Sequence, residues 1–290
     1  MHKAGFVNII GCPNVGKSTL LNALVGERLS IITSKAQTTR HRIMGIVSGE
    51  NYQIVFSDTP GIIKPMYKLQ EKMMHFVISA FTDADLFLLI TDIYEDVQLE
   101  DSYLAKLQKS QTPILLLINK VDIATQEKLE EKVIQWKEKL PNAEIIAISA
   151  LQKFNLDKVM ERIQELLPAN EAFYNKDEFT DRPERFFVSE IVREKILLNY
   201  RKEIPYSVEI IVNTFKEEEN IIRTQADILV ERDSQKGIII GDKGEALKRV
   251  GIQARKDLEA FFQKQIYLEL FVKVDKDWRS NDNRLKNFGY

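Results

Sequence analysis

The chain has 290 residues, of which 44% are hydrophobic and 29% charged, a composition typical of a globular protein with about two domains and enough apolar material for a core. Lys and Arg total 41 against 43 Asp and Glu, giving a net charge of -2, so overall charge would not hold the chain on nucleic acid and any such contact needs a local basic patch. The single cysteine, Cys12, excludes an intramolecular disulfide, and because there is neither a signal-peptide pattern nor an apolar run near the ~18 residues of a membrane span, the sequence favours a cytoplasmic protein.

From residue 5 to about 167, apolar runs alternate with segments of helical spacing. Continuous apolar runs predict strands that are covered on both faces, at Phe6–Ile10, Leu86–Ile90, Ile114–Ile118 and Ile145–Ile148. Helical spacing predicts helices at Lys17–Val25, Ser102–Gln108, Gln126–Leu140 and Asn155–Leu167. The alternation predicts an α/β domain with a mostly parallel sheet flanked by helices. Residues 43–57 are predicted to form an antiparallel hairpin at the sheet edge.

The pattern changes near Pro168, so we predict an α/β domain at residues 1–168, a linker at 169–182 and a second, α+β domain at 183–290. The predicted order in the second domain is helix, strand, strand, helix, helix, strand, followed by a short helical tail. The first helix is predicted at Glu184–Leu198 and the next two strands at Ser207–Asn213 and Ile221–Glu231. A helix pair follows, with a turn at Gly241–Gly244 and its end at Phe262. The last strand is predicted at Ile266–Val274 and the helical tail at Asn281–Phe288.

The segment GCPNVGKS, residues 11–18, matches the phosphate-loop pattern G-x-x-x-x-G-K-[ST] between a predicted strand and a predicted helix, as that motif requires. Its glycines let backbone N–H groups converge on phosphate oxygens at a helix N-terminus. Lys17 would bring positive charge to the outer phosphates, and the Ser18 hydroxyl is a candidate Mg²⁺ ligand. Cys12 is interpreted as a small loop residue, since it has no partner cysteine. The predicted nucleotide-binding residues here are Gly11, Cys12, Pro13, Asn14, Val15, Gly16, Lys17, Ser18 and Thr19.

The segment NKVD, residues 119–122, follows a predicted strand at the end where α/β folds place ligand-binding loops. The Asp122 carboxylate can accept two hydrogen bonds from the N1–H and exocyclic amine of guanine, whereas adenine has no such donor pair. We predict that Asn119 ties this loop to the phosphate loop and that the Lys120 stem packs along the base. A backbone N–H of Ser149 or Ala150 would reach the guanine carbonyl. The predicted guanine-binding residues are Asn119, Lys120, Val121, Asp122, Ser149 and Ala150.

The segment DTPG, residues 58–61, is the predicted sensor of the γ-phosphate of GTP. Asp58 would hold Mg²⁺ through water, and the Gly61 N–H would contact the phosphate. Thr39 is the candidate for the second protein ligand of Mg²⁺, with Thr38 as the alternative. Ile62 replaces the glutamine that orients water in Ras-like enzymes, which predicts slow intrinsic hydrolysis and leaves the general base unassigned. The predicted GTP-binding residues also include Thr59, Pro60 and Ile62. The predicted metal ligands are Ser18, Thr39 and Asp58. The catalytic candidates are Lys17 and Thr39.

A second glycine-marked loop, GDKG at residues 241–244, follows the strand-like run Ile238–Ile240 and precedes a helix. G-x-x-G alone is weak, but the surrounding element order fits a type-2 KH domain, where this loop lets the backbone approach four nucleotides. Between Lys243 and Lys256 five positive residues and one negative give a local charge of +4, which favours a phosphate backbone over a merely solvated helix face. The predicted RNA-binding residues are Ile240, Gly241, Asp242, Lys243, Gly244, Lys248, Arg249 and Arg255.

Together these motifs resemble the Era family of bacterial GTPases, in which a hydrophobic residue replaces the catalytic glutamine. The resemblance rests on residues 13–18, 37–40 and 58–61 and extends through 180–187, 251–258 and the ending 278–290. It implies that the RNA partner is the 3′ end of small-subunit ribosomal RNA, that the role is assembly of the small ribosomal subunit, and that the protein contacts the cytoplasmic membrane peripherally. It further implies Mg²⁺ as cofactor and, through Asn14, K⁺ as an activating cation. We expect a monomer.

Three other classes were weighed against this interpretation. An ATP-dependent kinase or helicase is disfavoured by Asp122, and an RNA-binding module with a vestigial nucleotide site by the intact set Lys17, Ser18, Asp58 and Asp122. A tRNA-modifying relative would need a one-carbon chemistry domain or a C-terminal cysteine, and the sequence contains neither.

Overall fold

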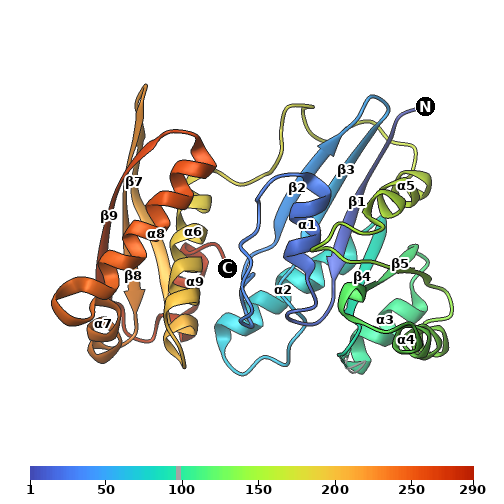
Figure 1. Cartoon of the computed structure of the whole chain (residues 1–290), viewed down its shortest axis with the longest axis horizontal. Helices are drawn as coiled ribbons and strands as arrows, with labels where there is room; N and C mark the ends of the chain where they lie inside the picture. Colours follow the sequence, from blue (N-terminus) through green and yellow to red (C-terminus); the bar gives the residue numbers. More distant parts are fainter. Residues whose placement is uncertain (96–98) are drawn as a thin grey trace. The chain divides into compact units, whose positions relative to one another are not determined.

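The computed structural model describes residues 1–95 and 99–290, which divide into two compact units (Figure 1). The element order confirms the predicted fold, an α/β domain followed by an α+β domain. Unit 1 consists of Met1–Ser30, Thr39–Pro65 and Lys72–Asp181, and unit 2 of Ile31–Thr38, Met66–Glu71 and Arg182–Tyr290.

Unit 1 is built on a six-stranded sheet with the order β2-β3-β1-β4-β5-β6. All neighbouring strands are parallel except β2 and β3, which form the predicted antiparallel hairpin at the edge. The central strands are apolar along their whole length because helices cover both faces. The strands are β1 Lys3–Ile10, β2 Ile43–Ser48, β3 Tyr52–Asp58, β4 Leu86–Asp92, β5 Ile114–Asn119 and β6 Glu144–Ala147.

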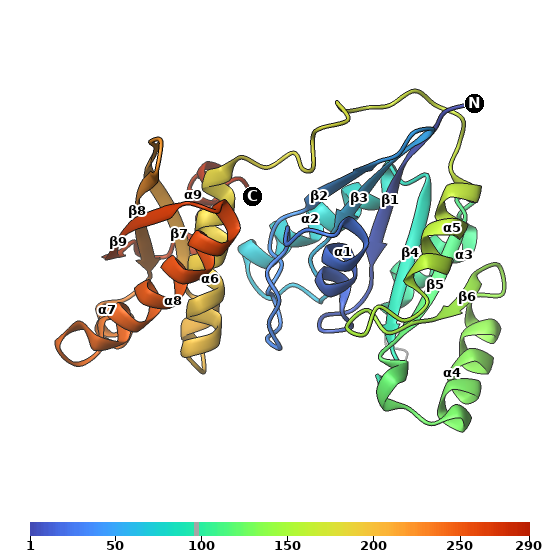
Figure 2. The same ribbon diagram turned by 45° about the horizontal axis from the view of Figure 1, so that its top comes forward.

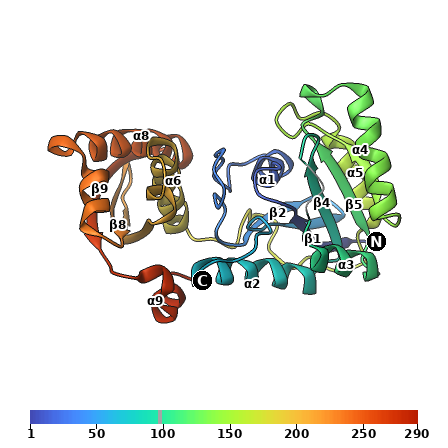
Figure 3. The same ribbon diagram turned by 90° about the horizontal axis from the view of Figure 1, so that it is seen from below.

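The helices of unit 1 lie on both faces of this sheet: α1 and α5 cover one face, and α2 and α3 the other (Figure 3). The ring of Phe81 on α2 lies 5.2 Å from that of Phe87 on β4 and 5.5 Å from that of Tyr103 on α3, so these two helices share one face. The helices are α1 Lys17–Val25, α2 Lys68–Thr82, α3 Asp101–Lys109, α4 Gln126–Lys139 and α5 Leu156–Leu166, with a short 3₁₀ turn at Val121–Ile123.

The parallel strands bring distant motifs to one edge of the sheet. The phosphate loop follows β1, Asp58 ends β3, Asn119 ends β5, and Ser149 follows β6. Because β1, β3, β5 and β6 all run in the same direction, their carboxyl ends meet where open α/β sheets bind ligands.

The stretch predicted as a linker, 169–182, is hydrogen-bonded to unit 1 along most of its length. The Ile46 N–H of β2 donates to the Phe179 carbonyl (2.9 Å), and the Gln53 side chain accepts from the N–H groups of Phe173 (2.7 Å) and Tyr174 (3.0 Å). These contacts use backbone groups and one buried glutamine. The polar sequence of residues 169–182, which has no hydrophobic period, therefore could not predict these hydrogen bonds.

Unit 2 has a three-stranded sheet of order β7-β8-β9, in which β7 and β8 are antiparallel and β8 and β9 parallel. The long helices α6 and α8 lie side by side on one face of this sheet (Figures 1 and 2), and their apolar faces form its core with the inward residues of the strands. The elements are α6 Glu184–Asn199, β7 Glu209–Glu217, β8 Ile221–Val230, α7 Asp233–Ile240, α8 Glu245–Phe262, β9 Gln265–Val274 and α9 Asp282–Asn287, with 3₁₀ turns at Ile204–Tyr206, Asp242–Gly244 and Trp278–Ser280.

The run Ile238–Ile240 was predicted to be strand-like and is instead the last turn of α7. Ile239 is fully buried whereas Ile238 is 50% exposed, because successive side chains point in different directions around a helix. An uninterrupted apolar triplet does not distinguish a strand from a helix end. Among the described residues, no helix is long and apolar enough to cross a membrane.

Candidate functional site

The phosphate loop needs glycine at both ends of its motif. Gly11 and Gly16 have φ angles of 153° and 103°. A Cβ atom would lie 2.3 Å from the Ile90 carbonyl oxygen at the first position and 2.3 Å from Asn119 Nδ2 at the second. Neither space can hold a side chain, so the backbone closes tightly against β4 and β5 and its N–H groups can converge on phosphate oxygens.

Lys17 begins α1 and is almost completely buried. Its Nζ donates to the carbonyl oxygens of Cys12 (2.6 Å) and Gly11 (3.2 Å), which places the ammonium group inside the loop. Burial lowers the pKa of Lys17, and the nearby Asp58 carboxylate opposes this shift. An anion in the loop would favour the charged form of this lysine.

Ser18, Thr39 and Asp58 converge at the predicted metal site. Ser18 Oγ donates to Asp58 Oδ2 (2.7 Å) and lies 2.9 Å from Thr39 Oγ1. Asp58 Oδ1 is buried and accepts no hydrogen bond from the described residues. Burial raises the pKa of Asp58, while Lys17 and the hydroxyls of Ser18 and Thr39 oppose this shift, and a cation bound here would further favour the ionised carboxylate. An oxygen-only donor set of this kind fits Mg²⁺.

The two candidate threonines differ in their surroundings. Thr38 Oγ1 donates to the Lys35 carbonyl (2.6 Å) and lies 2.6 Å from Thr33 Oγ1, so its hydroxyl is engaged within its own segment. Thr39 Oγ1 instead contacts Ser18 and also lies 3.3 Å from Asp58 Oδ2. The geometry favours Thr39 over Thr38 as the metal ligand.

The segment after β3 packs directly on the phosphate loop. A Cβ atom at Gly61 would lie 2.8 Å from atoms of Pro13, and the Ile62 N–H donates to the Gly11 carbonyl (3.1 Å). Thr59 is buried, with its hydroxyl donating to the Ile9 carbonyl (2.8 Å). The Ile62 side chain is also buried, and a buried hydrocarbon cannot orient an attacking water molecule.

Asn119 links three loops through its one side chain. Its Nδ2 donates to the Val15 carbonyl (2.8 Å), and its Oδ1 accepts from the Ala150 N–H (2.9 Å). The predicted tie to the phosphate loop is therefore confirmed. Lys120 adds a second tie through a hydrogen bond from its Nζ to the Asn14 carbonyl (3.0 Å), and it also forms an ion pair with Asp92.

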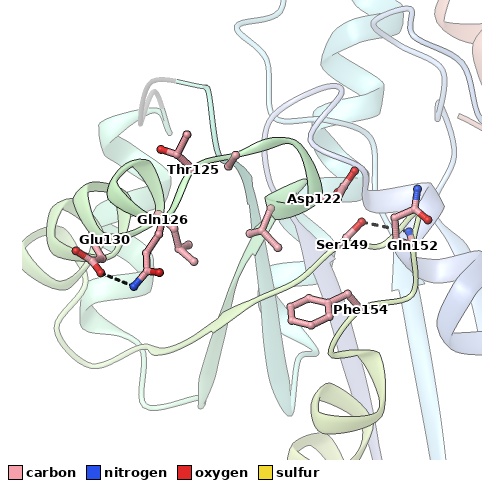
Figure 4. A pocket seen from close by; sticks show the side chains of 10 residues that line it. Asp122, Thr125, Gln126, Glu130, Ser149, Gln152 and Phe154 are labelled. Atoms are coloured by element: carbon pink, nitrogen blue, oxygen red, sulfur yellow. Dashed lines mark hydrogen bonds between the residues drawn. The ribbon is translucent and has the colours of Figure 1, made fainter.

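The Asp122 side chain is exposed and lines a pocket of about 600 Å³, shown in Figure 4. Phe154 and Ser149 come from the loop after β6, and Thr125 and Gln126 from the beginning of α4. The other lining residues are Val121, Ala124, Leu129, Glu130 and Gln152. Val121, Asp122 and Ser149 of the predicted base-binding set line this pocket, whereas Asn119, Lys120 and Ala150 do not.

The backbone donors after β6 that were predicted to reach guanine already have protein partners. The Ala150 N–H is used by Asn119, and the Ser149 N–H donates to the Phe154 carbonyl at 3.3 Å. Either N–H could reach a guanine carbonyl only by exchanging its partner or by sharing its hydrogen in a three-centre bond.

Cys12 lies inside the phosphate loop, and burial, reinforced by the Glu95 carboxylate, raises its pKa to about 11. The thiol is therefore neutral near pH 7 and a poor nucleophile. This agrees with the interpretation of Cys12 as a small loop residue.

In unit 2 the loop of residues 241–244 also requires glycine at its first position. Gly241 has a φ of 71°, and a Cβ there would lie 2.5 Å from the Ala246 Cβ. Gly244 has a φ of 83°, and Lys243 adopts a φ of 48°. Asp242 and Lys243 are exposed, so the tip of the loop presents its backbone to solvent.

A groove of about 410 Å³ runs beside this loop, between α8 and β9. Gly244, Lys248 and Arg255 of the predicted set line it. Ile240 ends α7, and Arg249 is exposed on α8 but does not line the groove. Sequence reasoning missed Leu247, Gly251, Ile252, Leu268 and Leu270. Residues three or four positions apart lie on one face of a helix, so counting from Gly244 along α8 could have identified Leu247, Gly251 and Ile252.

Three features of unit 1 define a P-loop GTPase: a phosphate loop closed by glycines, a cation site made only of oxygen donors, and a base-binding loop at the carboxyl edge of a parallel sheet. A KH-type module follows it in unit 2. Residues 6–120 match the family described as 50S ribosome-binding GTPase, and residues 203–279 match the KH domain. The chain is 46% identical to GTPase Era of Syntrophus aciditrophicus, with 100% of this chain and 96% of that relative covered. It is 42% identical to GTPase Era of Staphylococcus epidermidis, covering 100% and 97%. The chain belongs to the Era family of GTPases.

Two solved structures agree with it in both units. A crystal structure of Era in complex with MgGDPNP and nucleotides 1506–1542 of 16S ribosomal RNA superposes with a TM-score of 0.95 and 38% identity, covering 100% of this chain and 99% of that one. A variant of Aquifex aeolicus Era bound to GDP and AlF₄⁻ superposes with a TM-score of 0.94 and 38% identity, covering 99% of each chain.

Proposed function

We propose that this GTPase hydrolyses GTP slowly and couples its nucleotide state to binding of the 3′ end of small-subunit ribosomal RNA during assembly of the small ribosomal subunit. The observation that carries the proposal is the full-length similarity to an Era structure that holds both a GTP analogue with Mg²⁺ and a 16S ribosomal RNA segment. The phosphate loop and the groove beside residues 241–244 supply the two matching sites in this chain.

The residues of unit 1 divide the work of nucleotide binding. The N–H groups of the phosphate loop and Lys17 bind the phosphates, and Asp122 accepts hydrogen bonds from guanine. Ser18, Thr39 and Asp58 would hold Mg²⁺, which supplies positive charge against the β- and γ-phosphate oxygens when bound. Gly61 would contact the γ-phosphate through its N–H. Loss of that phosphate would release the segments around Thr39 and Gly61, a known switching arrangement.

Hydrolysis would be slow because the Ile62 side chain is buried and apolar. Rates of about 10⁻⁴–10⁻² s⁻¹ are usual for unassisted GTPases. We further propose that K⁺ accelerates the reaction through exposed Asn14. Phosphate release should be several-fold faster in K⁺ than in Na⁺ at equal ionic strength, and Asn14→Ala should remove the difference. Equal rates in the two salts would count against a role for K⁺.

RNA binding is assigned to the groove between α8 and β9. Lys248 and Arg255 are 67% and 55% exposed, and their ion-pair contacts within the described part of the chain, to Glu245 (3.7 Å) and Glu259 (3.9 Å), are long. Exposed pairs of this kind contribute little stability, so both cations can turn toward phosphates. Among the described residues β9 is an edge strand of its sheet, so the backbone groups on the side away from β8 can read base edges.

The decisive experiment separates the two binding activities. A double substitution, Gly241→Asp with Gly244→Asp, adds two negative charges beside the groove. Because a Cβ at Gly241 would lie 2.5 Å from the Ala246 Cβ, thermal unfolding of the variant must also show that unit 2 stays folded. We expect at least a hundredfold loss of affinity for an RNA oligonucleotide of the 16S 3′ end, with GTP affinity unchanged. Asp157→Asn, on the exposed start of α5, is the control and should affect neither. Undiminished RNA binding by the double variant would refute the assignment of the groove.

We also propose that the protein acts as a cytoplasmic monomer with peripheral contact to the cytoplasmic membrane face. The membrane contact is supported only by resemblance to the family. Sedimentation with liposomes of anionic lipid would test it, and recovery of the whole protein in the supernatant would refute it.

A further inference from the structure

Gly251 stands in the interior of α8, which spans 18 residues from Glu245 to Phe262. Glycine in a helix interior is unfavourable relative to alanine, because it loses more backbone freedom on folding. The backbone of Gly251 lies outside the left-handed range that only glycine adopts readily. The conformation of the helix therefore does not require glycine at this position.

Packing within the protein does not require it either. The nearest heavy atom to a Cβ at Gly251 would be Leu270 Cδ1, 3.7 Å away, which is an ordinary van der Waals contact. By contrast, the corresponding distances at Gly16 and Gly241 are 2.3 Å and 2.5 Å, so those two glycines are needed by the fold itself. Alanine would fit at 251 without moving any neighbour.

The place of Gly251 in the groove offers a reason for the glycine that neither the helix conformation nor the packing offers. It lines the middle of the RNA groove, with Lys248 and Arg255 one turn away on either side along α8. Leu268 and Leu270 of β9 line the same groove, on the side-chain face that β9 turns toward the helices. The groove wall at Gly251 is therefore bare helix backbone beside two apolar side chains.

We infer that Gly251 is a steric determinant of RNA binding, which leaves room for one nucleobase of the single strand between the α8 backbone and the side chains of Leu268 and Leu270. The flat apolar face of a base packs well on leucine methyl groups. Lys248 and Arg255 can then meet the phosphates on either side of that nucleotide. This inference rests on the proposed function, because it names how the same groove accepts its ligand.

The test uses the full-length chain and a fluorescent single-stranded RNA oligonucleotide of the 16S 3′ end. Gly251→Ala should weaken binding about tenfold and Gly251→Leu more than a hundredfold, in keeping with the loss of one base contact and then of the space itself. The melting temperature of both variants should be no lower than that of the unsubstituted protein, because each gains a better helix former.

The control is Gly237→Ala in α7, another helical glycine, whose Cβ position has no heavy atom of residues 1–95 and 99–290 within 4 Å. Gly237 lies outside the groove, so this variant should keep its RNA affinity within twofold. The inference is overturned if Gly251→Leu binds as tightly as the unsubstituted protein, or if Gly251→Ala lowers the melting temperature, since the fold would then explain the glycine. Failure of the unsubstituted protein to bind the oligonucleotide would instead refute the proposed function.

Discussion

At the scale of single residues, Asn119 connects the base-binding loop to the phosphate loop. Its amide nitrogen is used by the Val15 carbonyl and its amide oxygen by the Ala150 N–H. Both partners are backbone groups of loops that are distant in sequence. Neighbouring Asp122 has an exposed side chain. The buried amide therefore positions the loops, while the exposed carboxylate is left for the ligand.

Replacing Asp122 by asparagine should reverse the choice of base. The amide can accept only one of the two hydrogen bonds that guanine offers and places its NH₂ group against a donor. We expect GTP affinity to fall at least a hundredfold. Xanthosine triphosphate, which has a carbonyl in place of the exocyclic amine, should bind more tightly than GTP. Calorimetry with both nucleotides measures this, and an unchanged preference for GTP would show that Asp122 does not contact the base.

Cys12 gives a prediction that depends on pH. Since its pKa is raised to about 11, the thiolate fraction at pH 8 is about a hundredfold below that of an ordinary cysteine, partly offset by greater intrinsic nucleophilicity. Alkylation by iodoacetamide should be at least about tenfold slower than in the urea-unfolded chain. Its rate should rise about tenfold per pH unit from 7 to 10, because protons are lost only as the pH approaches 11. A plateau below pH 9 would contradict the raised pKa.

At the scale of elements, α1 is bounded by two glycines of left-handed conformation, with φ angles of 103° at Gly16 and 84° at Gly26. Gly16 is crowded and Gly26 is not, because no heavy atom of the described residues lies within 4 Å of a Cβ at Gly26. Gly16→Ala should displace Asn119, and we expect at least a hundredfold loss of GTP affinity as well as reduced stability. Gly26→Ala, the matched control, should cost about 1–2 kcal/mol of stability from its strained conformation and leave GTP binding intact. Equal GTP affinities for both variants would contradict this account.

Most elements could be predicted because their hydrophobic period was unambiguous, and α1 begins and ends at the predicted residues. The helix α2 was not predicted, although Leu69, Met73 and Val77 recur on one buried face. The end of α7 was mistaken for a strand because three consecutive isoleucines carry no period. The hydrogen bonds of residues 169–181 were missed because backbone pairing at a sheet edge leaves no pattern in the side chains.

The candidate site was predictable to a different extent in each unit. Fixed motifs located the phosphate loop and the base loop, since their glycines and polar residues have roles that depend on sequence spacing. The choice between Thr38 and Thr39 needed coordinates, because adjacent hydroxyls differ only in where they point. The groove wall of Leu268 and Leu270 could not be predicted, since a half-buried leucine in a strand resembles any core residue.

At the scale of the whole molecule, coupling between the GTP site and the RNA site is reciprocal by thermodynamic necessity. Under the proposed function, a 16S 3′-end oligonucleotide that binds the GTP state more tightly must raise the affinity for a non-hydrolysable GTP analogue by the same factor. We expect a factor of about 5–150, the usual range for coupled sites. Lys17→Ala should abolish the effect of nucleotide on RNA binding while leaving RNA binding itself. Identical RNA affinities with the GTP analogue and with GDP would refute the coupling.

The stretch 169–181 has a consequence for the outermost strand of unit 1. Through Phe179 and the side chain of Asp181 it occupies N–H groups of β2 that would otherwise be exposed. Bare strand edges recruit other chains and promote aggregation. A polypeptide cut after Pro168 should therefore aggregate on concentration, whereas one cut after Asp181 should remain dispersed in light scattering. By this account residues 169–181, which the sequence presents as a linker, protect the edge strand β2 from pairing with other chains.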